Sequence, residues 1–106
     1  MLRKGTEFHR ATVSQEIREI LNPNNEGEPG TYREIQVLVP DEPQVYVTTL
    51  PDAAKRFGTD RTYKLPPIPP GAQITFRLLP GQPLFAAARS GQATITLIVE
   101  HHRGEP

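Results

Sequence analysis

The stretch LPPIPPGAQITFRLLPGQPLFAAARSGQATITLIVE, residues 65–100, decides the fold. Its final run, Ala93–Val99, alternates apolar and threonine side chains, which is typical of a strand with one buried face. The run Ile74–Leu78 alternates in the same way, and Leu84–Ala88 is apolar on both faces, as in a closely packed strand. Turns at Leu79–Pro83 and Ser90–Gln92 separate the three runs. We therefore predict that they form an antiparallel meander.

The two turns have the residues that tight turns require. Proline fixes φ at Pro80, and Gly81 supplies the positive φ of a type II turn. Ser90 and Gly91 are typical of a turn that joins two hairpin strands. Ser90 also lacks the G-x-S-x-G context of a catalytic serine, so we predict a turn role for it.

The N-terminal part predicts one strand and one helix. Thr6–Val13 alternates weakly and is interpreted as a first strand. From there the period changes, because Val13, Ile17, Ile20 and Leu21 are spaced as on one face of a helix. We therefore predict a short N-terminal helix over Ser14–Leu21, stopped at Asn22-Pro23.

The middle of the chain predicts two strands and an edge segment. Tyr32–Val39 places Ile35, Val37 and Val39 inward, and Gln44–Leu50 is expected to pair back with it as a hairpin across Pro40–Pro43. Residues 51–58 favour one helical turn, with an irregular crossover loop as the alternative. Leu65–Gly71 contains four prolines and must be extended, either as an edge segment or as a polyproline connector.

These elements predict an all-β protein. The expected architecture is an antiparallel β-sandwich of jelly-roll or immunoglobulin-like size, with six to seven strands and one short N-terminal helix. The expected organisation is an N-terminal arm over residues 1–5, a sandwich domain over residues 6–100 and a C-terminal tail over residues 101–106.

Composition supports one small domain with many turns. The chain has 106 residues, of which 12 are prolines and 8 are glycines. There is no cysteine, which excludes disulfides and thiolate metal sites. No run approaches the roughly 20 apolar residues of a membrane span, and the first residues lack the apolar stretch of a secretory signal. We therefore expect the protein to be made in a cytoplasm.

The net charge is zero, but the charges are grouped. Residues 1–10 and 55–64 are basic, whereas residues 26–44 are acidic. Opposite patches on one domain suit contacts between copies, although a mixed solvated surface is the simpler interpretation. A nucleic-acid-binding protein would show a basic excess, so nucleic acid is not an expected partner.

No residue pattern predicts catalysis or a cofactor. His101 and His102 are adjacent and would point to opposite faces of a strand, so they are not expected to share a metal. The paired carboxylates Asp41-Glu42 and Glu26/Glu28 lie in turns, where nothing would desolvate them. Oxygen ligands in Asn22–Glu28 lack the spacing of an EF-hand calcium loop. A cupin-type enzyme would need a His/Glu cluster on strands, which the sequence does not reveal.

The order of the elements resembles that of small β-sandwich virion proteins of tailed bacteriophages. The resemblance covers roughly residues 6–100: FHRATVSQEIREIL, REIQVLV, PQVYVTT, FGTDRTYKLPPIPPG, PGQPLFAAA and the closing SGQATITLIVE. It implies a non-enzymatic capsid decoration or cement protein, made in the host cytoplasm and placed on the capsid surface. The implied partners are the major capsid protein and copies of the chain itself, with a trimer favoured. Cofactor, membrane and small-molecule substrate are not expected.

The expected partner-binding residues are basic or exposed and lie in two segments. They are Arg3, Lys4, Phe8 and Arg10 at the N-terminus, and Lys55, Arg56 and Arg61 in the middle of the chain. One alternative function is a tail or head–tail accessory protein. Another is a carbohydrate- or receptor-binding module, which predicts that Tyr46, Tyr63 or Phe57 lie on one exposed platform. Otherwise the tyrosines, including Tyr32, cover sheet edges.

Overall fold

The computed structural model describes residues 6–22, 30–60, 62–65 and 67–103. Over these residues the chain forms eight strands and one helix. In chain order they are β1 Thr6–Val13, β2 Arg18–Leu21, β3 Thr31–Leu38, β4 Val45–Thr48, α1 Pro51–Thr59, β5 Pro67–Ile68, β6 Gln73–Leu78, β7 Leu84–Ala88 and β8 Ala93–Arg103. No helix in the described ranges is long and apolar enough to cross a membrane.

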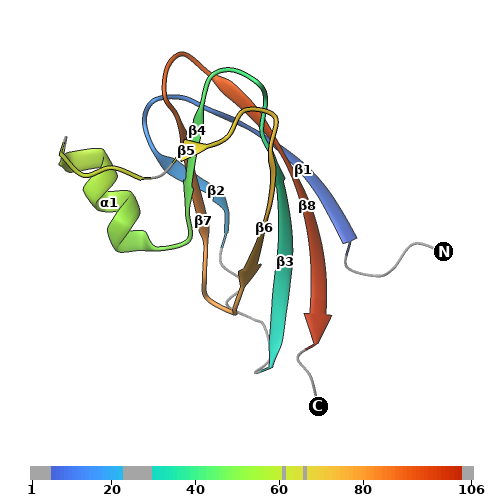
Figure 1. Ribbon diagram of the computed structural model, residues 1–106. Helices are drawn as coiled ribbons and strands as arrows, with labels where there is room; N and C mark the ends of the chain where they lie inside the picture. The colour runs from blue at the N-terminus through green and yellow to red at the C-terminus, as the bar shows by residue number, and fades with distance from the viewer. Residues whose placement is uncertain (1–5, 23–29, 61, 66, 104–106) are drawn as a thin grey trace.

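The strands form two four-stranded antiparallel sheets that lie as two layers (Figure 1). The first sheet has the order β1-β8-β3-β6 and the second the order β2-β7-β4-β5. The predicted all-β class is confirmed, but the strands number eight within the described part of the chain, and not six or seven.

The predicted meander over residues 65–100 is wrong. Its three runs are strands, but β6 and β8 belong to the first sheet, whereas β7 belongs to the second. The hairpin expected between the strands at Tyr32–Val39 and Gln44–Leu50 is also wrong, since β3 and β4 lie in different sheets. In both places the chain crosses from one layer to the other. The period-2 pattern does not predict this crossing, since it determines which face of a strand is buried and not which strand is its partner.

The turns themselves follow the predicted geometry. Gly81 has a φ of 88°, and the backbone N–H of Gln82 donates to the carbonyl of Leu79 at 3.0 Å, which closes a turn with Pro80 at its second position. Gly91 also has a positive φ, 55°. These turns connect strands of the two different sheets and do not close hairpins.

The predicted N-terminal helix is wrong as well. Residues 18–21 form β2, which pairs with β7, and its register shifts between Glu19 and Leu21. Ile20 and Leu21 are both partly buried against the core. The register shift lets the consecutive side chains of Ile20 and Leu21 both pack against the core, so their place in the helical spacing does not require a helix.

The short helix of the fold lies instead at α1, where one helical turn was the favoured prediction. Pro51 stands at its first turn, and the helix ends at Thr59, one residue beyond Gly58. The expected edge segment is confirmed in part, because Pro67–Ile68 forms the two-residue edge strand β5 beside β4. Proline is tolerated there because an edge strand leaves one side unpaired.

The core joins both sheets in one hydrophobic cluster. Strand β8 contributes Ile95, Leu97 and Val99, and β3 contributes Ile35 and Val37, all at most 1% exposed. From the second sheet the cluster includes Val45, Ile68, Leu84, Ala86 and Ala88. The inward faces predicted for β3, β6 and β8 are thus those that carry the buried side chains.

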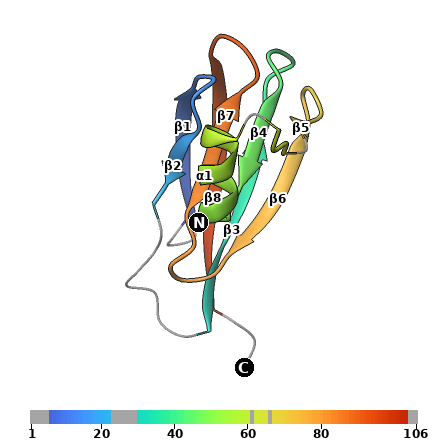
Figure 2. The ribbon, with the colours of Figure 1, turned by 90° about the vertical axis from the view of Figure 1, so that its left-hand side faces the viewer.

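Helix α1 covers the outer face of the second sheet (Figure 2). Its buried residues are Ala53 and Ala54. Ala87 lies on the face of β7 that points away from the first sheet and the core. It is nevertheless fully buried. Small side chains on both elements therefore let the helix approach the sheet closely.

Substitution of Ala87 tests this helix–sheet contact. We expect Ala87→Leu to lower the free energy of unfolding by about 1–3 kcal/mol, because the larger side chain overpacks the space under α1. Thr75→Leu is the control, since Thr75 is exposed on the outer side of β6, and its effect should stay within about 0.5 kcal/mol. Urea denaturation measures both, and equal effects would mean that α1 does not cover Ala87.

Candidate functional site

The expected partner-binding residues lie on two separate parts of the structure. Phe8 and Arg10 are on β1, at the edge of the first sheet, whereas Lys55 and Arg56 are on α1, over the second sheet. Arg3, Lys4 and Arg61 lie outside the described residues. The structure therefore does not bring the two expected segments together within the part it describes.

On β1, Phe8 and Arg10 face outward. Phe8 pairs in register with Ile98, and Arg10 with Thr96, both on the side of β8 opposite the core. Phe8 is 70% exposed, the largest exposure among the large apolar side chains of the described residues. Within the described residues the one helix, α1, lies on the side of the second sheet, so Phe8 and Arg10 lie on a sheet face that no described helix covers (Figure 1).

A second outward group lies farther along the same face. The rings of Tyr32 and His102 stack with centroids 5.1 Å apart, and the guanidinium of Arg77 lies 4.5 Å from the centroid of Tyr32. The three residues come from β3, β8 and β6, so the stack crosses three neighbouring strands. It gives Tyr32 a role on the sheet face and not at a sheet edge.

His101 points to the opposite side from His102, as strand alternation predicts. Its Nε2 lies 3.0 Å from Glu7 Oε2, and His9 Nε2 lies 2.8 Å from Glu7 Oε1. The C-terminal tail expected over residues 101–106 does not begin at residue 101, because β8 continues to Arg103. The antiparallel pairing of β1 with β8 therefore assembles a His/Glu group that linear spacing does not reveal.

Arg33 is a further residue that the sequence interpretation missed. It occupies an inward position of β3, is only 6% exposed, and donates from Nη2 to the carbonyl of Gln82 at 3.0 Å. Burial lowers the pKa of Arg33, and the charge of Glu7 acts in the opposite direction. The signal was present in the sequence, since Arg33 has the same strand parity as Ile35.

Glu7, His9 and His101 form a hydrogen-bonded group. Hydrogen bonds from His9, and then from His101, lower the pKa of Glu7. Among the described residues, no group of three or more His, Cys, Asp or Glu side chains is arranged to hold a metal ion. The loop considered for calcium, Asn22–Glu28, lies outside the described residues except for Asn22.

The lowered pKa of Glu7 predicts an acid-dependent loss of stability. Because the folded pKa lies below the ordinary value of 4.5, Glu7 stabilises the folded state above that pH. This contribution disappears as the pH falls through the folded pKa. Since Glu7 is about half exposed, we expect less than about 1 kcal/mol.

Unfolding of the wild type and of Glu7→Gln at pH 5.5 and pH 3 measures this effect. The wild type should be the more stable protein at pH 5.5, and the difference should shrink at pH 3. Glu16→Gln is the control, because Glu16 is exposed and does not belong to the group of Glu7, His9 and His101. A difference that grows toward pH 3 would contradict the assignment.

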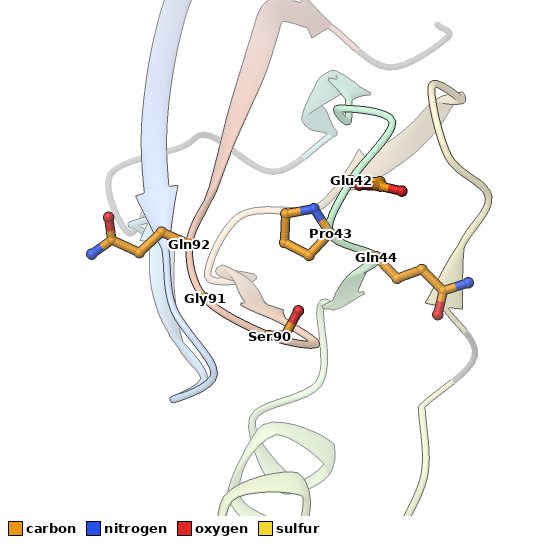
Figure 3. Close-up of a pocket in the computed structure, with 6 residues that line it drawn as sticks. All are labelled: Glu42, Pro43, Gln44, Ser90, Gly91 and Gln92. Carbon is orange, nitrogen blue, oxygen red and sulfur yellow. The ribbon is translucent and has the colours of Figure 1, made fainter.

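Two loops form a depression at one end of the sheets, shown in Figure 3. Its volume is about 440 Å³, and it is lined by Glu42, Pro43, Gln44, Ser90, Gly91 and Gln92. The side chains of Glu42, Gln44 and Gln92 point in different directions and do not converge. Glu42 is its only ionisable lining residue. This arrangement offers no paired acid and base and no nucleophile with a base beside it.

An aromatic pocket lies on the outer side of the second sheet, between α1, β4 and β5. The volume of this pocket is about 300 Å³. Strand alternation turns Gln44, Tyr46 and Arg89 outward. The complete lining is Gln44, Tyr46, Phe57, Tyr63, Lys64, Leu65, Pro67 and Arg89.

The three aromatic residues of this pocket come from different elements. The rings of Tyr46 on β4 and Phe57 on α1 have centroids 5.2 Å apart at 48°. The guanidinium of Arg56 lies 5.0 Å from the centroid of Tyr63, which follows the helix. Tyr46, Tyr63 and Phe57, which the carbohydrate- or receptor-binding alternative expects on one exposed platform, line one pocket and are each partly buried.

The polar groups of the aromatic pocket include an amide and two cations beside the two tyrosine hydroxyls. Arg89 Nη1 donates to Gln44 Oε1 at 2.9 Å, and the backbone N–H of Arg89 donates to the carbonyl of Gln44 at 2.8 Å. Lys64 also lines the pocket, and no lining residue is acidic. Aromatic walls with a few fixed polar groups are the usual composition of a small-ligand site.

Comparison of the chain with protein-family models, curated proteins and solved structures finds no match.

Proposed function

We propose that the two sheets form a jelly-roll sandwich and not an immunoglobulin-like one. The strands pair as β1 with β8, β2 with β7, β3 with β6 and β4 with β5, as when a ribbon of eight strands is folded in half. Viral capsid domains, lectins and cupins use such eight-stranded double sheets. The immunoglobulin sheet order ABED would require the first two strands to pair, whereas β1 and β2 lie in different sheets.

We propose that the protein is a non-enzymatic virion accessory protein that decorates the outer surface of a phage head and stabilises it. The observation that carries this proposal is the jelly-roll pairing, a fold that capsid domains use. The corresponding partners are the major capsid protein and further copies of the chain, with a trimer favoured, on the capsid surface after synthesis in the host cytoplasm.

The open face of the first sheet supports attachment there. Phe8 is a large exposed aromatic and Arg10 is an exposed cation two residues away on the same face. Aromatic residues and arginine dominate the binding energy of protein interfaces. Repeated copies on a shell would add weak contacts through effective concentration.

Co-sedimentation with phage heads tests the proposal. We expect the wild-type protein to sediment with expanded or unexpanded heads of the phage that carries its gene, and Arg10→Glu to bind at least about tenfold more weakly. Arg18→Glu makes the same charge change on β2 of the second sheet and should bind normally. Absence of binding to both kinds of head would overturn the proposal.

The position of bound protein separates the two virion roles. Electron microscopy of labelled particles should show the label over the whole head for a decoration protein. Label confined to the tail or to the head–tail junction would favour an accessory protein of the tail instead.

A second candidate function is a carbohydrate- or receptor-binding module. One observation favours it: Tyr46, Phe57 and Tyr63 gather in the aromatic pocket. Lectins also use the jelly-roll fold.

A glycan array tests the second candidate. We expect the wild type to bind a defined set of glycans and Tyr63→Ala to lose that signal, because the ring forms one wall of the pocket. Tyr32→Ala should leave the signal unchanged, since Tyr32 lies on the first sheet. An array with no bound glycan would argue against carbohydrate binding.

A further inference from the structure

The cations of the aromatic pocket lack anionic partners. Among the described residues, the ion pairs within 4.0 Å all involve histidine, and none involves Lys64 or Arg89. Arg89 donates to the neutral amide oxygen of Gln44. Two exposed positive charges therefore line the pocket beside its aromatic side chains, with no counter-charge within 4.0 Å among the described residues.

The carboxylate nearest to Lys64 along the chain is engaged elsewhere. Asp60 Oδ1 accepts hydrogen bonds from the backbone N–H of Thr62 at 2.9 Å and from Thr62 Oγ1 at 2.6 Å. These hydrogen bonds lower the pKa of Asp60, and the charge of Arg56 adds to the effect. Asp60 is not among the residues that line the pocket. The pocket thus presents a positive potential that suits a negatively charged ligand.

The shape of the site favours a compact ligand over a peptide strand. An extended peptide usually binds by adding a strand to a free sheet edge. The edge strand next to the pocket is β5, which has only two residues, Pro67 and Ile68, and is followed by Pro69 and Pro70. Proline has no N–H to donate, so this edge is poorly suited to a further strand.

We infer that the aromatic pocket binds a carboxylate-bearing sugar residue. The rings of Tyr46, Phe57 and Tyr63 contact the apolar face of the sugar, and Lys64 and Arg89 bind its carboxylate. The amide of Gln44 remains beside Arg89 to donate to a hydroxyl. This inference rests on the second candidate function and adds the charge class of the ligand.

Titration of the full chain with defined saccharides tests the inference. The probes are a hyaluronan tetrasaccharide, which carries glucuronate, and chitotetraose, which is its neutral counterpart. Tyr46 and Tyr63 are two of the three tyrosines and the chain has no tryptophan, so tyrosine fluorescence reports on the pocket. We expect the acidic tetrasaccharide to change this fluorescence and to bind at least about tenfold more tightly than the neutral one.

Charge-removing variants locate the effect. Lys64→Gln and Arg89→Gln should each weaken binding of the acidic tetrasaccharide by about tenfold or more, because each removes a charged hydrogen-bond donor. Arg77→Gln is the matched control, since it removes one positive charge from the first sheet, where Arg77 lies over the ring of Tyr32. Circular dichroism should show that all three variants remain folded.

The outcomes separate the hypotheses. Equal binding of the neutral tetrasaccharide would overturn the inference and leave the second candidate function intact. Equal or tighter binding of a tetraglutamate peptide would overturn the inference in favour of a peptide site. Equal weakening of acidic tetrasaccharide binding by Arg77→Gln would overturn the assignment to the pocket, since it would show general charge attraction. Binding of no saccharide would overturn both the inference and carbohydrate binding, but not the proposed virion role.

Discussion

The alternation of β8 is the constraint on which the rest of the structure depends. β8 lies between β1 and β3 and pairs with each of them, so its register sets the register of the first sheet. Ile95, Leu97 and Val99 all turn toward the core and are almost fully buried. A slip of one residue would move this whole set to the open face, and the cost of exposing three such side chains is about 1.5–3 kcal/mol each. The register is therefore strongly determined.

The core-facing side of β8 becomes polar beyond its apolar residues. Beyond Val99 the same face continues to His101, which meets Glu7 of β1. Arg33 continues the inward face of β3 and reaches the Gln82 carbonyl. Figure 1 shows the ends of β3 and β8 extending beyond the second sheet, where the inward face no longer has a sheet opposite it. A polar network thus terminates the core at this end.

The sequence predicted the faces of the strands well but not their partners. Strand alternation identified the buried sides of β3, β6 and β8 because burial depends on each side chain and its immediate neighbours. Pairing depends on the path of the chain between the layers, and no local signal marks that a tight turn such as Pro80-Gly81 joins two sheets. The general preference for pairing between sequential strands favoured the meander, and this fold departs from it.

The candidate sites were also predictable to different degrees, because local patterns do not determine which strands pair. The hypothesis of an aromatic platform named Tyr46, Phe57 and Tyr63, and these residues do gather, because α1 and the segment after it pack beside β4. The Glu7 group was not predicted, since residues 7 and 101 become neighbours only through the β1–β8 pairing. Long-range pairing of this kind cannot be inferred from the spacing of histidines along one strand.

The basic side chains of residues 55–64 are adjacent in the sequence but lie on different surfaces of the structure. Lys55 lines a depression with Ile17, Arg18 and Phe85 on one side of α1. Arg56 lies over the ring of Tyr63 in a cation–π contact, and Lys64 lines the aromatic pocket. A helix distributes successive side chains around its axis, so adjacent cations serve different surfaces. Lys64 thus lines the aromatic pocket together with Arg89 of the β7–β8 connection, from which it is separated by 25 residues in the sequence.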